Sequence, residues 1–170
     1  MGYYKKLVLR VLFALLLVIF SSVIYYIIGP ITLYSSYLLL KPFSDAILSG
    51  NIINIDGNSL EFIEACAATL AYILLGILIL LTYGISLKKG IKLFLIGSLL
   101  IFIANLIRIE VLIYILVNYG IDYFNTLHLF IWKIVSSVYV ALVWIFLCYK
   151  YKIKGIPVYS DLKKIKERIK

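Results

Sequence analysis

The sequence predicts an all-α integral membrane protein with about four transmembrane helices, both termini inside, and a connector at the outer interface. Three observations lead to this fold class. Hydrophobic residues make up 64% of the 170 residues, against roughly 45–50% in soluble domains. Charged residues make up only 15%, against about 25% in soluble domains. The mean hydropathy is +1.07. A small water-soluble domain cannot bury so much apolar surface, and a disordered chain would be far less hydrophobic.

Four apolar stretches are long enough to cross the hydrocarbon core, which requires about 20 residues per helix. They cover residues 7–28, 62–83, 93–118 and 127–149. With the connector at 29–61, these stretches form a predicted polytopic membrane domain over residues 1–150. The remaining residues, 151–170, are predicted to be a basic cytoplasmic tail. We expect this tail to lie along anionic headgroups as a short helix, with docking of a partner as the alternative.

The first stretch is expected to be a retained anchor, because its apolar core exceeds the roughly 7–15 residues of a signal peptide. We expect its helix to end at Gly29-Pro30. The apolar run Leu33–Leu40 is then too short to span, and we interpret it as an interfacial or re-entrant helix. The segment from Asn51 to Asn58 predicts a short strand followed by a turn at Asp56-Gly57.

The basic residues assign the sides of the membrane. Fourteen of the 17 Lys and Arg residues precede the first span, lie between the second and third, or belong to the tail. Because basic residues concentrate on the cytoplasmic side, both termini are predicted to be inside. Five acidic residues fall on the opposite side: Asp45, Asp56, Glu61, Glu64 and Asp122. The net charge of +9 therefore indicates membrane topology and contact with lipid headgroups, not nucleic-acid binding.

Three reactive side chains are predicted to lie at one depth in the outer leaflet, each on a different span. Cys66 lies about one turn into the second span from its outer end. Arg108 lies about 22 Å along the third span, within about 8 Å of the outer boundary. His128, the only histidine, opens the fourth span at its outer end. Ionisable groups inside a membrane are costly, so they are functional candidates.

A thiol, a guanidinium and an imidazole together can carry out acyl transfer. The thiolate is the attacking form and needs a nearby cation or base. An imidazole can take the thiol proton or protonate a leaving amine, and an arginine can hold the thiolate, the substrate carbonyl or the oxyanion. The sequence leaves open which of these Arg108 does. The predicted site therefore consists of Cys66, Arg108 and His128 as catalytic residues, with Asn105, Glu64 and Lys133 as secondary substrate-binding or orienting candidates.

Each candidate also has a purely structural explanation. A cysteine in an apolar span is often only a small hydrophobic side chain. Glu110 points to the opposite helix face from Arg108 and could pair with Lys133 instead. Asn105 shares a face with Arg108, and it could orient the guanidinium or bond across helices. No Cys/His spacing resembles a zinc site, so no metal is predicted.

The sequence contexts of these residues resemble the exosortase/archaeosortase family. Glu64-Ala65-Cys66-Ala67-Ala68 resembles the cysteine motif of that family, and Asn105-Leu106-Ile107-Arg108-Ile109 resembles its arginine motif. His128 is similar in position to the family's histidine, and the resemblance covers roughly residues 52–148. In the family the cysteine is often followed by Ser or Thr and then Gly, whereas both positions are Ala here. The length of the chain is most similar to the compact archaeosortases.

This resemblance implies a sortase-like cysteine protease or transpeptidase in the plasma membrane, with its active site facing outside and Cys66, Arg108 and His128 at the catalytic positions. Its substrates would be secreted proteins whose C-terminal signal combines a short motif, a hydrophobic helix and a basic cluster. The enzyme would cleave through a Cys thioester and transfer the new C-terminus to an acceptor, often a lipid, without a cofactor. The small residues around the cysteine would admit a substrate helix or simply pack the bundle: Ala65, Ala67, Ala68, Thr69 and Ala71.

A second hypothesis comes from a different class of protein. The chain could be a non-catalytic transport or scaffold subunit in which Arg108, Glu110 and Lys133 form a structural network and Cys66 only packs. A serine intramembrane protease is not expected, because Ser98 lies in the inner half of its span, far from His128.

Overall fold

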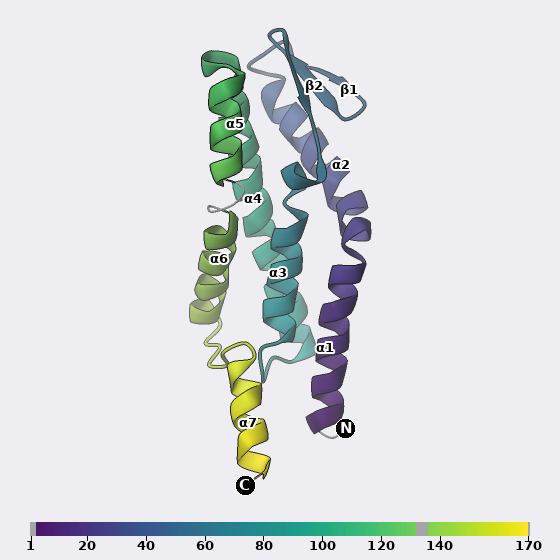
Figure 1. The fold of residues 1–170 in the computed structure, drawn as a ribbon, viewed down its shortest axis with the longest axis vertical. Coiled ribbons are helices and arrows are strands. Elements are labelled where there is room, and N and C mark those ends of the chain that lie inside the picture. The colour runs from purple at the N-terminus through teal and green to yellow at the C-terminus, as the bar shows by residue number, and fades with distance from the viewer. Residues whose placement is uncertain (1–2, 132–135, 170) are drawn as a thin grey trace.

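The computed structural model describes residues 3–131 and 136–169 and shows an elongated bundle of helices with a small sheet at one end (Figure 1). We call this the sheet end. Both described chain ends lie at the opposite end, which we call the basic end. The predicted helical membrane fold is thus confirmed in outline, with a sheet added. The number of membrane crossings and the inside location of the termini stay predictions.

The N-terminal third of the chain forms two helices in nearly continuous succession, α1 (Tyr3–Ile19) and α2 (Ser21–Leu40), joined at Phe20. Pro30 lies inside α2, so the expected helix end at Gly29-Pro30 is wrong, and no separate helix begins at Leu33. Proline removes the N–H that would bond the Tyr26 carbonyl, and the helix continues past this lost bond. Two residues further on, Thr32 Oγ1 donates to the Ile28 carbonyl over 2.8 Å. In an apolar environment, continuing the helix leaves fewer unpaired backbone groups than ending it.

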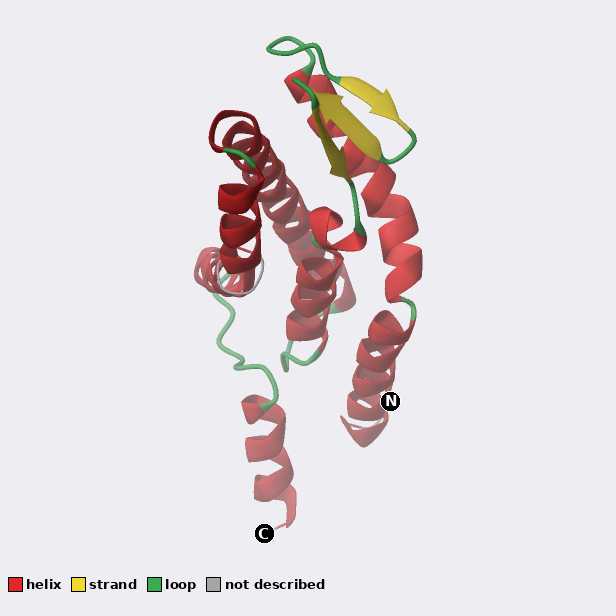
Figure 2. Ribbon diagram, turned by 45° about the horizontal axis from the view of Figure 1, so that its top comes forward, coloured by secondary structure: helices red, strands yellow, loops and turns green. Residues whose placement is uncertain are grey.

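Three short strands follow, β1 (Ile47–Ser49), β2 (Ile52–Ile55) and β3 (Asn58–Glu61), and they pair antiparallel in the order β1-β2-β3 (Figure 2). The predicted strand is β2, and the predicted turn at Asp56-Gly57 joins β2 to β3. Asp56 has a φ of 47° and Gly57 a φ of 79°, as a tight two-residue hairpin requires. The sequence did not predict β1 and β3.

The inner face of this sheet closes a hydrophobic core. Ile53, Ile55 and Phe62 are almost completely buried. They pack in one cluster with side chains from α2 and from α4 (Leu87–Tyr119), among them Leu33 and Ile113. The sheet is therefore a cap on the helices, and the chain leaving β3 enters the bundle at a fixed place.

The chain then forms one turn of 3₁₀ helix, η1 (Glu64–Ala67), before α3 (Thr69–Leu80) begins. The expected second helix from about residue 62 is thus wrong at its start. Ala68 stands between the two with φ 54° and ψ 32°, in the left-handed region. Glycine fills this region at no steric cost, and alanine is strained there.

The second half of the chain folds back on α4. Gly120, with a φ of 84°, separates α4 from α5 (Ile121–Phe130), which packs against α4 through Phe124. The structure continues with α6 (Ser136–Lys150) and α7 (Tyr159–Ile169). The expected fourth stretch at 127–149 therefore covers the end of α5 and most of α6.

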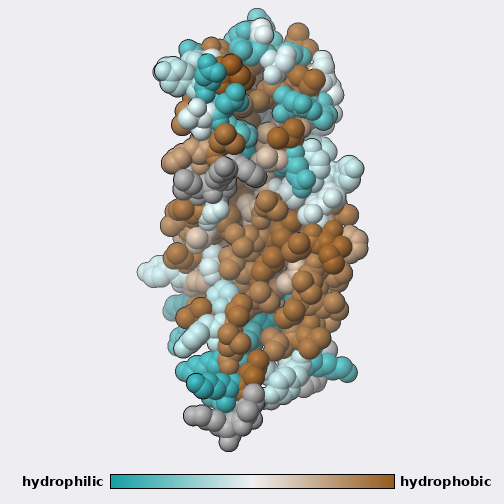
Figure 3. Space-filling view, in the orientation of Figure 1, coloured by the Kyte–Doolittle hydropathy of each residue, from teal (hydrophilic) through white to brown (hydrophobic). Residues whose placement is uncertain are grey.

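The middle of the molecule is covered by apolar side chains, whereas both ends are polar (Figure 3). Two described helices, Ser21–Leu40 and Leu87–Tyr119, are long and apolar enough to cross a membrane. Thr69–Leu80 and Ser137–Lys150 are apolar but shorter. Outward-facing large residues such as Leu95, at 64% exposure, would be unfavourable in water. This surface indicates a membrane protein.

Helix α7 is attached to the basic end by a buried carboxylate. Asp161 forms a salt bridge with Arg10 of α1 over 2.9 Å and accepts a hydrogen bond from the Tyr3 hydroxyl over 2.9 Å. From this attachment α7 extends along the long axis of the molecule (Figure 1). The short helix expected in the tail is present as α7, and its position against lipid headgroups stays a prediction.

We predict that Gly97→Ala destabilises the protein by about 1–3 kcal/mol, because it overpacks the bundle. A Cβ at Gly97 would lie 2.6 Å from Leu75 Cδ2 and 3.1 Å from Leu147 Cδ1, and both leucines are completely buried. Gly90→Ala is the control: its Cβ would come no closer than 3.4 Å to any side chain. Thermal unfolding in detergent should show a loss for Gly97→Ala only; equal stabilities would contradict the packing.

We also predict that Ala68→Gly stabilises the protein by about 1 kcal/mol, since it removes a left-handed alanine. The control is Ala71→Gly, which places glycine within α3 and should cost about 0.5–1 kcal/mol. Unfolding of both variants in the same detergent measures the difference. Destabilisation by Ala68→Gly would show that this backbone is not left-handed.

Candidate active site

Cys66 lies on η1, in the segment that links β3 to α3, and not within a helical span as expected. Its N–H donates to the Ile63 carbonyl over 2.9 Å. The side chain is a free thiol, 7% exposed, and it packs in the core cluster beneath the sheet. Cys148, the other free cysteine, lies near the end of α6, at the basic end of the bundle.

Two polar side chains of α4 hold the backbone of this segment. Asn105 Nδ2 donates to the Cys66 carbonyl over 2.8 Å. Arg108 Nη2 donates to the Ala65 carbonyl over 2.9 Å and, more weakly, to the Cys66 carbonyl over 3.4 Å. Asn105 is 5% exposed and lies in the buried stripe of α4. Because the residues are three apart on one helix, they reach the same turn of η1 together.

Arg108 and His128 were expected to lie close to Cys66. Arg108 is close enough to both Cys66 and His128 to interact with each electrostatically. His128 belongs to the last turn of α5, not to the outer head of a fourth helix as expected. Its ring lies 5.4 Å from that of Phe124, centroid to centroid. Its Nδ1 is buried and has no hydrogen-bond partner among the described residues.

The secondary candidates have different positions. Asn105 contacts Cys66 directly, as described above. Glu64 opens η1 and lines a pocket next to Arg108. Lys133 lies outside the described residues. Glu110, the predicted partner of Lys133, accepts a hydrogen bond from the fully buried Ser36 of α2 over 2.8 Å.

A pocket of about 630 Å³ adjoins the segment that carries Cys66. Small residues from α3 and η1 form much of its wall, and one of them, Thr69, has a buried hydroxyl without a hydrogen-bond partner among the described residues. Cys66 does not line it, although Ala65, Ala68 and Arg108 do. The Cys66 thiol therefore lies outside the pocket, next in sequence to Ala65, which lines it.

Sequence reasoning missed three features of this site: the left-handed Ala68, the carbonyl of Ala65 as a partner of Arg108, and the contact between Ser36 and Glu110. The first had a signal in the sequence. The resemblance described above implies a glycine two residues after the cysteine, and glycine favours the conformation that Ala68 adopts here.

Comparison with known proteins places the chain in a family. The sequence model described as transmembrane exosortase (Exosortase_EpsH) matches residues 2–147. The probable archaeosortase E of Methanocaldococcus jannaschii is 40% identical over 118 residues. That match covers 65% of this chain but only 61% of the relative. No solved structure matches the chain. Because the family model covers most of the chain, and the structure has the apolar surface of a membrane protein, this chain belongs to the transmembrane exosortase family.

Proposed function

We propose that the protein is a membrane-embedded cysteine protease or transpeptidase. It cleaves a C-terminal sorting signal of secreted proteins and transfers the new C-terminus to an acceptor, for which a membrane lipid is our candidate. The observation that carries this proposal is the pair of hydrogen bonds from Asn105 and Arg108 to the turn that bears Cys66. These two side chains, one buried and one partly buried, fix the backbone of the residue that would be the nucleophile.

In the proposed reaction, His128 takes the proton of the Cys66 thiol, and the thiolate attacks the carbonyl carbon of the scissile peptide bond. The C–N bond breaks, His128 delivers a proton to the leaving amine, and an acyl thioester forms on Cys66. His128, now neutral, takes the proton of the acceptor's nucleophile, which attacks this thioester and releases the thiolate. Arg108, always protonated, is positioned to stabilise the oxyanion of each tetrahedral intermediate.

The pocket beside Cys66 gives the substrate an approach. Its small wall residues, Ala65, Ala68 and Ala71, allow the backbone of another helix to come close. The thiol packs against the core, so the side chain of Cys66 has to turn toward the pocket for attack. We expect this pocket to receive the hydrophobic helix of the sorting signal.

The proposed site faces the outside of the cell. Thirteen of the fifteen described basic residues gather at the other end of the bundle, and basic residues mark the cytoplasmic side. With this orientation, four crossings would place both termini inside and the sheet on the outer surface. A sorting motif emerging from the outer leaflet would then meet Cys66.

We predict that Cys66→Ala abolishes signal processing while the protein remains folded, because the thiol is the nucleophile. The assay co-expresses this protein with secreted reporters that carry several motif–helix–basic-cluster signals, and intact mass reports processing and any adduct on Cys66. Cys148→Ala, at the basic end, is the matched control and should process normally.

Processing that survives Cys66→Ala would refute a cysteine mechanism. If no reporter is processed and Cys66 does not react with a small impermeant thiol reagent, the result favours the scaffold hypothesis. The hydrogen bond between Ser36 and Glu110 supports that alternative, since it ties α2 to α4 without any catalytic role. In that case Arg108→Ala should chiefly reduce stability.

We further predict that Asn105→Asp lowers the processing rate about 10- to 100-fold, because small misplacements of a reacting group are costly. The substitution keeps the shape of the side chain but replaces the Nδ2 donor with an acceptor facing the Cys66 carbonyl. Asn118→Asp is the matched control, since Asn118 of the same helix donates Nδ2 to the Tyr114 carbonyl over the same 2.8 Å on the surface. Equal rates for the two variants would contradict a positioning role.

A further inference from the structure

The basic end carries an excess of positive charge. Of the fifteen described Lys and Arg residues, thirteen belong to the start of α1, the start of α4, or the segment from the end of α6 through α7. Only two of the eight acidic residues of the chain, Asp161 and Glu167, lie in these segments. Such a charge distribution attracts anions to this end.

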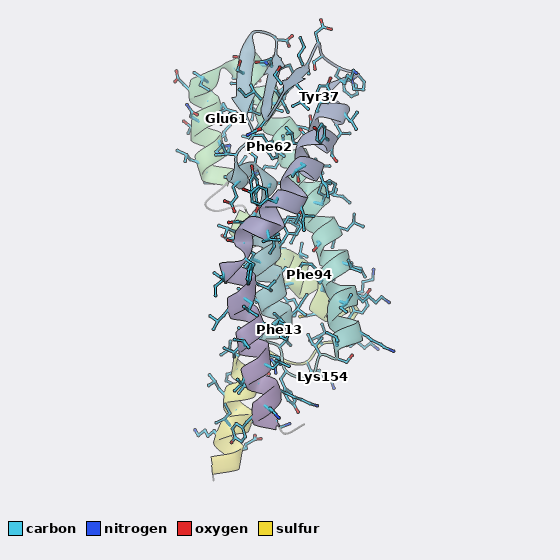
Figure 4. All side chains as sticks on the ribbon, turned by 90° about the vertical axis from the view of Figure 1, so that its right-hand side faces the viewer. Phe13, Tyr37, Glu61, Phe62, Phe94 and Lys154 are labelled. Carbon is cyan, nitrogen blue, oxygen red and sulfur yellow. The ribbon has the colours of Figure 1, made fainter. Side chains whose placement is uncertain are left out.

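A pocket of about 410 Å³ opens here between the α3–α4 loop and the linker from α6 to α7. Three lysines line it, Lys89, Lys152 and Lys154, and no acidic residue does. Figure 4 labels Lys154 at this end, far from Glu61 and Phe62 at the sheet end. The rest of the wall consists of Tyr83, Gly84, Ile85, Ile153, Gly155 and Ser160.

The two walls are fixed to each other by backbone contacts. The Val158 N–H donates to the Leu81 carbonyl over 3.0 Å. Gly155 lies so close to the opposite loop that a Cβ there would stand 2.6 Å from the Tyr83 carbonyl oxygen. Only glycine permits this approach, so the lysines project from a formed pocket and not from a loose tail.

The two carboxylates of the basic end, Asp161 and Glu167, do not neutralise the pocket. Asp161 is buried, and its two oxygens are already bonded to Arg10 and to the Tyr3 hydroxyl. Glu167 is exposed on α7 and does not line the pocket. Lys89 bonds the Tyr151 carbonyl over 3.0 Å, which positions its ammonium group without cancelling the charge.

We propose that this pocket binds a phosphate group. A lysine ammonium is a compact charge with three donors, and it suits the oxygens of a phosphate. The pocket lies beside the start of α4, where the long apolar helix begins, and Ile85 and Ile153 give it an apolar side. That position fits the headgroup of an anionic phospholipid, and soluble phosphates offer the same chemistry. The inference does not depend on the proposed peptidase activity.

The test measures ligand binding to the purified full chain in detergent by native mass spectrometry. One arm titrates phosphatidylglycerol, with phosphatidylcholine as the neutral comparison, and a second arm titrates inorganic pyrophosphate without lipid. The variant Lys89→Gln/Lys152→Gln/Lys154→Gln is compared with Lys6→Gln/Lys163→Gln/Lys166→Gln, which removes the same charge from the same end outside the pocket. Single Lys154→Gln, at an exposed position, replaces the triple variant if that fails to fold.

We expect phosphatidylglycerol to bind the pocket variant about 100-fold more weakly, or about fivefold per lysine, and to bind the control variant nearly as the wild type. Loss of pyrophosphate binding alone would support the pocket with a soluble ligand. Equal weakening in both triple variants would show diffuse attraction by the basic end and overturn the proposal. Absence of binding of either anion to the wild type would overturn it as well.

Discussion

The candidate site depends on the hydrogen bond from Asn105 Nδ2 to the carbonyl of Cys66. Inside a membrane, backbone groups outside regular structure must find partners within the protein. The 3₁₀ turn and the left-handed Ala68 interrupt the helical ladder between β3 and α3, and carbonyls there need other donors. Asn105 and Arg108 supply them. The longest described helix, α4, therefore supplies the hydrogen bonds that this irregular segment needs.

The position of Asn105 and Arg108 along the bundle axis depends on packing at a distance from the site. The same stripe of α4 that carries Asn105 also carries Gly97, two turns toward the basic end. Gly97 lets α4 approach the side chains of Leu75 and Leu147, and this close contact fixes the register of α4 against α3 and α6. A change in that register would move the donor of Asn105 away from its carbonyl. Stability of the bundle and geometry of the site are thus coupled through one helix face.

The sequence predicted that Arg108 lies near Cys66, because membrane depth constrains where residues of different spans can meet, and helical spacing put Asn105 on the same face as Arg108. The bond from Asn105 to the Cys66 carbonyl was not predicted. It could not predict the local structure at Cys66, since hydropathy reports burial and does not distinguish a 3₁₀ turn from an α-helix. The prediction that a helix ends at Pro30 was wrong for a related reason. Proline breaks helices in water, whereas an apolar environment favours a continuous helix. The sequence placed His128 at the head of a span because the helix that carries it begins earlier, at Ile121, within a stretch whose polar residues looked like a loop.

The contacts of Arg108 also bear on the role that the sequence left open. Its Nη2 bonds the Ala65 carbonyl well, at 2.9 Å, and the Cys66 carbonyl poorly, at 3.4 Å. If the bond from Arg108 to the Cys66 carbonyl breaks, that carbonyl keeps its shorter bond from Asn105. Under the proposed mechanism, a substrate carbonyl entering the pocket that Arg108 lines can replace this weak contact without leaving any protein carbonyl unpaired. The Arg108 guanidinium would then first bond the backbone of η1 and later stabilise the oxyanion. It can leave the Cys66 carbonyl because Asn105 still donates to that carbonyl.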